Sequence, residues 1–146
     1  MIKYFKVTSI FLLGVFSILL ISCNNNDDDL DPDASCEDVI CTLELRRMTV
    51  TVRDENENPV ALDSFEVVNI KDGSNITIAV SPSEFEGARE FGQYPLIEDG
   101  VLGKNQVEQI QFRGFIDGQE VVSSDYEVST DCCHIGLVLG SLLITL

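Results

Sequence analysis

The sequence predicts an all-β domain, an antiparallel β-sandwich of about seven strands, behind a removable leader and a disordered acidic tether. Three observations predict the sandwich. Apolar and polar residues alternate with a period of two in several short runs, turn residues separate these runs, and alanine and lysine are scarce, with four of each in 146 residues. Such strands bury one face, so about seven of them in about 110 residues fit two packed sheets.

Composition limits the function classes. The chain has 25 acidic and nine basic residues, a formal net charge of −16, five cysteines, one histidine and no tryptophan. Binding of nucleic acid or of an anionic membrane surface needs a cationic face, which nine basic residues can hardly build in this background. We therefore expect no nucleic-acid partner, and no motif in the chain indicates a cofactor or a resident metal.

Residues 1–22 form the leader. Lys3 and Lys6 come before a run of about fifteen mostly apolar residues, and no acid occurs in the segment. This order of charge and apolar run is typical of a secretory signal peptide. The alternative, a membrane-spanning helix, needs about 20 apolar residues, and this run is shorter.

The leader ends in Leu20-Ile21-Ser22-Cys23. This tetrad resembles the lipobox of bacterial lipoproteins, in which the cysteine is acylated and becomes the new N-terminus. The resemblance implies that Cys23 carries lipid and attaches the protein to a membrane. More than one acyl chain makes such attachment stable. The alternative is an ordinary cleavage site followed by a chance cysteine.

Residues 23–35 form the tether. Five aspartates fall within residues 27–33, and almost nothing in the segment is apolar. We expect no packed structure here. An acidic stretch directly after the lipidated cysteine also resembles the export signal of Bacteroidetes-type lipoproteins, which implies the outer membrane, facing the cell exterior. A solvated spacer on the periplasmic face is the alternative.

The domain spans residues 36–146. Alternation predicts half-buried strands over 48–53, 76–80 and 109–113, with turns at 54–59, 71–74 and 117–118. The Asp117-Gly118 pair suits a two-residue hairpin turn with positive φ. Leu43 and Leu45 lie out of phase with Met48, which predicts a bulge at Arg46-Arg47 in a long first strand.

The segment 81–105 breaks this pattern. Ser81-Pro82-Ser83-Glu84 predicts one or two helical turns, because it supplies an N-cap, a first-turn proline and a capping glutamate. The rest shows no periodicity, and long loops are often functional. We therefore treat Phe85, Phe91 and Tyr94 as a candidate binding loop. The alternative is that these rings close one end of the sandwich core.

Residues 135–146 are strongly apolar and too short to span a bilayer. We expect two buried strands here, joined at Gly140-Ser141.

The run from Met48 to Val60 is a valine-rich strand that ends in Asp, an Asn-containing turn and Pro-Val. It resembles the opening of carboxypeptidase-regulatory-like and transthyretin-like (prealbumin-like) sandwich domains. Residues 131–134, Asp-Cys-Cys-His, resemble a pattern in secreted Bacteroidetes lipoproteins. The resemblance implies an immunoglobulin-like or prealbumin-like accessory domain without catalysis, and it implies no ligand.

Cys36, Cys41, Cys132 and Cys133 are an even set in a chain with an export leader, which predicts two disulfides. A bridge between adjacent Cys132 and Cys133 would be strained, so we favour bridges from the start of the domain to its late strand, in either pairing. The alternative is a zinc site built from Cys36, Cys41, Cys133 and His134.

His134 is the only histidine, so any Ser-His or Cys-His hydrolase would depend on it, and no Gly-x-Ser-x-Gly motif accompanies it. Asp54, Asn56 and Asn58 imitate the first ligands of a calcium loop, but Pro59 stands where that loop needs glycine. We expect a structural histidine and a solvated turn.

These observations favour a lipid-anchored, non-enzymatic surface sandwich that serves as an interaction or accessory module for a protein or glycan. A small glycan-binding or hydrolase accessory lipoprotein and a purely structural envelope component are the alternatives.

Overall fold

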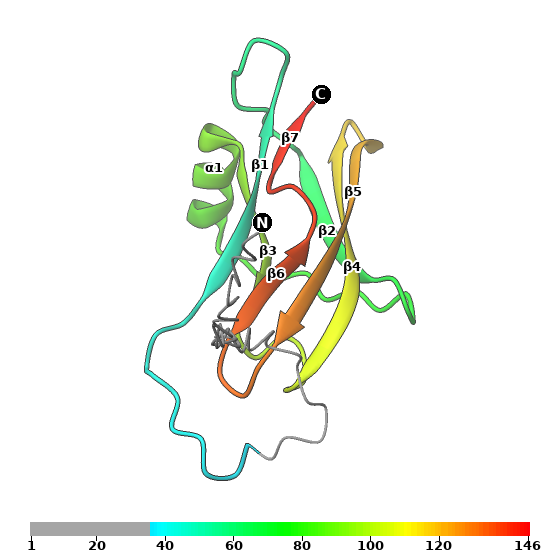
Figure 1. Ribbon diagram of the computed structural model, residues 1–146. Coiled ribbons are helices and arrows are strands. Elements are labelled where there is room, and N and C mark those ends of the chain that lie inside the picture. The colour runs from blue at the N-terminus through cyan, green and yellow to red at the C-terminus, as the bar shows by residue number, and fades with distance from the viewer. Residues whose placement is uncertain (1–35) are drawn as a thin grey trace, which may run out of the picture.

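The computed structural model describes residues 36–146, which form a β-sandwich with one helix (Figure 1). This confirms the predicted fold class. In chain order the elements are β1 (Arg47–Arg53), β2 (Ser64–Asn69), α1 (Pro82–Phe91), β3 (Gln93–Glu98), β4 (Gln106–Ile116), β5 (Gln119–Thr130), β6 (Ile135–Leu139) and β7 (Leu143–Thr145). Within the described residues, no helix has the length and apolar character needed to cross a bilayer.

The strands make two sheets. One has the order β3-β1-β7 and the other the order β2-β4-β5-β6. All pairs are antiparallel except β1 with β7, which is parallel. The chain crosses from one sheet to the other between β6 and β7. Helix α1 lies on the outer side of the three-stranded sheet (Figure 1).

The core lies between the sheets, and its centre is aromatic. Tyr94 and Phe112 are fully buried, and the ring of Phe65 lies 5.7 and 5.9 Å from theirs. Gly114 on β4 is needed for close packing, because a Cβ there would lie 2.5 Å from a Val122 methyl and 2.6 Å from a Leu62 methyl. The other buried members of this core cluster are Val50, Val52, Leu62, Val67, Ala88, Leu96, Ile97, Ile110, Val122, Tyr126, Val128 and Ile135.

The predicted hairpin turn at Asp117-Gly118 is confirmed. It joins β4 and β5, the two longest strands, and both residues have positive φ, 51° and 73°. These are the dihedrals of the turn whose twist matches that of paired strands. The pairing of this hairpin runs from Gln106 opposite Thr130 to Ile116 opposite Gln119.

Two strand predictions were wrong. Residues 76–80 form no strand: Ile76 donates its N–H to the Val67 carbonyl, but Val67 in turn donates to the Thr77 hydroxyl rather than to a backbone carbonyl. The Thr77 hydroxyl thus replaces a backbone carbonyl as hydrogen-bond acceptor, so regular strand pairing between this segment and β2 stops. The first strand begins only at Arg47, so the exposed Leu43 and Leu45 lie outside it, and its register shift falls after Met48 instead of at Arg46-Arg47.

The C-terminal segment does contain two strands separated at Gly140-Ser141, as predicted, but they belong to different sheets. The expectation that they are buried was wrong. Leu139 is 69% exposed and Leu143 is 58% exposed. Both strands are the last in their sheets, so no further strand of the described chain covers them.

Most of the segment 81–105 is not a loop, and apart from Ser81 and Gly92 at the ends of the helix only residues 99–105 lie outside helix and strand. The predicted capping box is present, with Glu84 N–H donating to the Ser81 hydroxyl and Ser81 N–H donating to the Glu84 carboxylate, but the helix continues for ten residues. Gly92 ends it in the left-handed conformation, and β3 follows directly. A Cβ at Gly92 would lie 2.6 Å from the Val52 carbonyl, so this position requires glycine.

Candidate functional site

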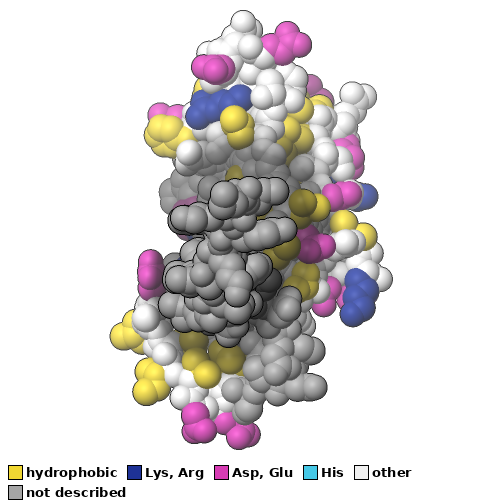
Figure 2. Space-filling model, viewed as in Figure 1, with side chains coloured by type: hydrophobic (Ala, Val, Ile, Leu, Met, Phe, Trp, Pro, Cys, Tyr) yellow, Lys and Arg dark blue, Asp and Glu magenta, His cyan; other side chains and the backbone are white. Residues whose placement is uncertain are grey.

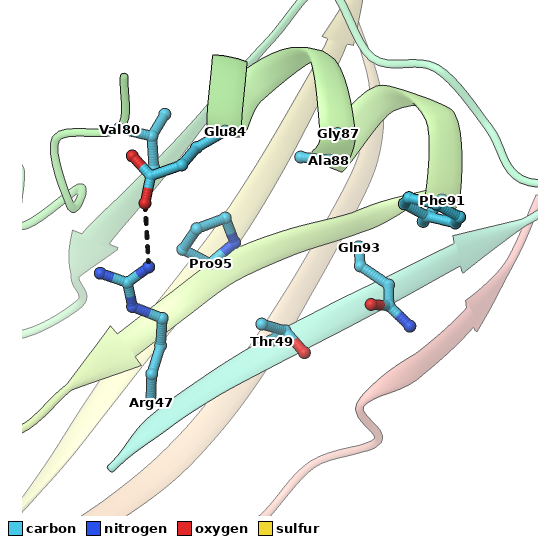
Figure 3. Close-up of a pocket in the computed structure, with 9 residues that line it drawn as sticks. All are labelled: Arg47, Thr49, Val80, Glu84, Gly87, Ala88, Phe91, Gln93 and Pro95. Carbon is cyan, nitrogen blue, oxygen red and sulfur yellow. Dashed lines mark ion pairs between the residues drawn. The ribbon is translucent and has the colours of Figure 1, made fainter. Parts of the chain in front are cut away.

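The candidate site is a groove between α1 and the outer face of the three-stranded sheet, which we call the α1 groove (Figure 3). Its volume is about 230 Å³. One side is formed by Val80 and α1, and the other by β1 and β3. The residues that line it are Arg47, Thr49, Val80, Glu84, Gly87, Ala88, Phe91, Gln93 and Pro95.

Charge is concentrated at one end of the α1 groove. Arg47 Nη1 lies 3.8 Å from Glu84 Oε1 across the groove (Figure 3). Arg47 Nη2 lies 2.6 Å from Glu98 Oε2 on the neighbouring strand. The Ser81 N–H donates to the Glu84 carboxylate and lowers the pKa of Glu84, and the Arg47 charge acts in the same direction. Glu84 therefore remains ionised at neutral pH, and its charge holds the Arg47 guanidinium at this end of the α1 groove.

The opposite end is aromatic. Phe91 stands at the last helical position, is 58% exposed, and lines the groove with the carboxamide of Gln93 (Figure 3). An exposed ring beside polar hydrogen-bonding groups can stack on an apolar or sugar face while its neighbours bond the edge of the same ligand.

The three residues of the candidate binding loop have different roles. Tyr94 is fully buried, accepts from Leu62 N–H at 2.7 Å and donates to the Val60 carbonyl at 2.7 Å, so it belongs to the core. Burial raises the pKa of Tyr94. Phe85 is half-buried and its ring lies 6.2 Å from that of Phe65. Of the three, only Phe91 is mostly exposed to solvent.

Phe85 also borders a second, shallower hollow of about 450 Å³ on the other side of α1, beside β2 and residues 77–82. Phe65, Ile78 and Pro82 contribute to its wall. This hollow carries one carboxylate, Asp63, which forms an ion pair of 3.6 Å with Arg89 of α1. Its two rings, Phe65 and Phe85, are half-buried rather than exposed, so we regard it as the flank of the helix and not as the site.

The predicted disulfides are confirmed, and the open pairing is resolved as Cys36–Cys132 and Cys41–Cys133. Both bridges link the segment before β1 to the turn between β5 and β6. The cysteines of the zinc alternative are thus oxidised and cannot serve as thiolate ligands. Among the described residues, no group of three or more metal-ligating side chains is close enough to hold a metal ion.

His134 lies beside these bridges in a chain of hydrogen bonds. Its Nδ1 is 2.8 Å from Asp99 Oδ2, and its Nε2 is 3.1 Å from the hydroxyl of Thr42. Asp99 also accepts the N–H groups of Arg46 and Ile135, each at 2.8 Å. A hydroxyl, an imidazole and a carboxylate in this order have the connectivity of a nucleophile, base and orienting acid.

The network fixes the charge of Asp99. Partial burial acts to raise the pKa of Asp99, but hydrogen bonds from His134 and from the Arg46 and Ile135 N–H groups outweigh it and hold the pKa below its usual value. The carboxylate is thus an anchor that joins three segments distant in sequence: residues 42–46, the end of β3 and the start of β6.

Asp54 uses its carboxylate within its own turn. Oδ1 accepts the N–H groups of Asn56 and Asn58, each at 2.8 Å, and the Asn58 side chain donates to Oδ2 at 3.0 Å. The side-chain and backbone hydrogen bonds from Asn58 lower the pKa of Asp54. This is the solvated turn that the sequence predicts.

Cys23, the predicted lipidation site, lies outside the described residues. No protein-family model, no curated protein and no solved structure matches the chain.

Sequence reasoning did not find several residues of these two regions. The sequence pattern predicts only a bulge at Arg47, and nothing in the spacing of Thr42, Asp99 and His134 indicates that they lie together. A signal for Phe91 existed: the Phe91-Gly92 step is a helix end followed by a left-handed glycine, and recognising it would have placed Phe91 on a helix.

Proposed function

We propose that this chain is a lipid-anchored, non-enzymatic β-sandwich lipoprotein of a bacterial envelope and that it acts as an interaction or accessory module. The leader, the Leu20-to-Cys23 tetrad and the acidic tether support the anchoring. Two disulfides in the sandwich suit the oxidising compartment into which such a leader directs a chain. The likeness of residues 48–60 to carboxypeptidase-regulatory-like domains supports the accessory role.

Anchoring is tested by replacing Cys23 with alanine. Lipid attached at Cys23 predicts that wild type incorporates a palmitate analogue and fractionates with the outer membrane, whereas Cys23→Ala remains unprocessed or is released. If Cys23→Ala fractionated in the same way as wild type, lipid attachment at Cys23 would be ruled out. Protease treatment of intact cells then separates the two orientations, because a chain facing the exterior is digested and one facing the periplasm is protected.

The interaction role depends most on one observation, the 58% exposure of Phe91 at the mouth of the α1 groove. An aromatic ring left exposed to water is unfavourable, since about 25 cal/mol is gained for each Å² of apolar surface removed from water. A ring left exposed beside a carboxamide and an ion pair suits contact with a protein or glycan. A partner that covers this ring would gain that energy.

The partner is sought by cross-linking in intact cells followed by co-purification. The decisive variant is Phe91→Ser, with Val107→Ser as the matched control, because Val107 is 49% exposed but lies on β4, away from the groove. We expect a single stoichiometric partner that Phe91→Ser loses and Val107→Ser retains. A purely structural component would give no such partner, and equal loss in both variants would contradict the groove as the contact.

The second candidate is a small hydrolase or glycan-binding accessory protein. The hydrogen-bonded order Thr42, His134, Asp99 favours the hydrolase form. A hydrolase of this kind predicts turnover of activated esters by the full chain that Thr42→Ala abolishes. The absence of turnover, together with no hits for the protein on a glycan array, would remove this candidate.

A further inference from the structure

The four outer edges of the two sheets differ in how they are protected. The outer strands are β2 and β6 in one sheet and β3 and β7 in the other. The edge of β2 is covered by the following segment, through Ile76 N–H to the Val67 carbonyl and Val67 N–H to the Thr77 hydroxyl. The edge strand β3 contains Pro95, which has no backbone N–H to donate to a further strand.

The edge of β6 has none of these protections, whereas on β7 the Ser141 hydroxyl donates to the Leu143 carbonyl and accepts the Leu143 N–H. Residues 135–146 contain no charged residue and no proline, in a chain of net charge −16. Leu139 on β6 and Leu143 on β7 are 69% and 58% exposed. Proteins normally blunt an exposed edge with lysine, proline or a covering segment, because an open edge is a template for pairing with another strand. We call residues 137–139, at the end of β6, the C-terminal edge.

This edge is held in place at both ends. At the start of β6, the N–H of Ile135 is already bonded to Asp99, and Cys133 is bridged to Cys41. At the other end, the Ser141 carbonyl accepts the Tyr126 hydroxyl, and the Leu142 carbonyl accepts the Thr51 N–H. The open stretch between these points is therefore a fixed template, and a segment that pairs with it need not order it first.

The surroundings of the edge are acidic. Leu143 and Thr145 line a hollow of about 550 Å³ with three carboxylates, those of Asp54, Glu55 and Glu57. Arg53 is the one basic residue in that lining, and its guanidinium is directed to the Glu57 carbonyl at 3.4 Å. On β5, Glu127 lies opposite Leu139. Acidic side chains are also spread over both ends of the face drawn in Figure 2.

We propose that the C-terminal edge binds an extended segment of a partner protein by strand addition, and that this segment has apolar side chains flanked by lysine or arginine. The backbone of β6 supplies the pairing, the exposed leucines contact the apolar side chains, and the carboxylates attract the basic flanks. A second copy of this chain is the poorer occupant, because residues 36–146 hold 20 acidic and seven basic residues and would bring like charges together.

The test uses the full purified chain and two synthetic nonapeptides with the same alternating Val/Thr centre, one ending in lysines and one in glutamates. We expect the lysine peptide to bind and the glutamate peptide to bind on the order of tenfold more weakly or not at all. Leu139→Lys places lysine, a residue that natural proteins use to block sheet edges, at an exposed position. It should weaken binding of the lysine peptide by a similar factor. The matched control, Val107→Lys, lies on an inner strand and should bind like wild type.

A second variant, Glu55→Gln, leaves β6 itself unchanged. It should weaken binding of the lysine peptide, mainly at low salt. Equal binding of both peptides, no binding of either, or equal loss in Leu139→Lys and Val107→Lys would overturn the proposal. So would a dimer in sedimentation that Leu139→Lys dissociates, since a second copy would then occupy the edge. Phe91 lies outside this surface, so a failure here is distinguishable from a failure of the α1 groove.

Discussion

The two disulfides overlap so closely that each should make the other partly redundant. Cys36–Cys132 and Cys41–Cys133 have sequence separations of 96 and 92 residues, yet their ends are only five residues apart on one side and adjacent on the other. Either bridge alone closes the long loop. The second then closes only a small ring, made of residues 36–41 and 132–133.

The magnitudes follow from loop-closure entropy. Closing a loop of this length destabilises the unfolded chain by about 4.7 kcal/mol at 25 °C, whereas the small ring contributes only about 2.5 kcal/mol. Replacing the cysteines of either bridge by serine should therefore cost about 2.5 kcal/mol in the free energy of unfolding, and replacing all four should cost about 7 kcal/mol. The combined loss exceeds the sum of the single losses by about 2 kcal/mol.

Urea unfolding of wild type and the three variants, followed by circular dichroism at 25 °C, checks this. A domain of this size has about 5–15 kcal/mol of stability, so each single-bridge variant should unfold cooperatively at lower urea and the four-serine variant should be marginal or unfolded. Two outcomes would refute the reasoning. One is a loss of about 5 kcal/mol for each single bridge. The other is a four-serine variant whose loss equals the sum of the two.

Two further predictions concern buried polar groups. Tyr94→Phe removes the hydroxyl that bonds the buried Leu62 N–H and the part-buried Val60 carbonyl, and should cost about 2 kcal/mol in urea unfolding. Tyr126→Phe removes one bond to a carbonyl and should cost less, and the reverse order would contradict this account. Asp99 has a pKa below its usual value in the folded state, so its contribution to stability is present above about pH 4 and is lost as pH falls through the folded pKa. Asp99→Asn should therefore be less stable than wild type at pH 7, and the difference should shrink toward pH 2; a difference independent of pH would exclude the linkage.

The parts of the fold that the sequence predicted well are local. The Asp117-Gly118 turn and the Ser81 capping box are fixed by residues a few positions apart, and both are present. The disulfides were predictable as links between the two ends of the domain because of cysteine number and the strain of a vicinal bridge.

The errors have a common cause in tertiary structure. Alternation over 76–80 correctly reflects the burial of Ile78, but pairing ends because the Thr77 hydroxyl takes a backbone position. The apolar residues after Ile135 resemble a buried pair of strands, and only the sheet order reveals that both are outer strands. The Arg47–Glu84 and Asp99–His134 pairs join segments more than 30 residues apart, which no spacing rule predicts.

The position of the bridges also determines how the domain responds to pulling. A force applied to the chain before Cys36 is transferred through Cys36–Cys132 and Cys41–Cys133 to the turn before β6, and it bypasses every strand from β1 to β5. With the C-terminus as the other attachment point, only residues 134–146 can extend, about 45 Å against about 390 Å for an unbridged domain. The strands from β1 to β5 are thus shielded from such a pull, which can detach only β6 and β7 from their sheets.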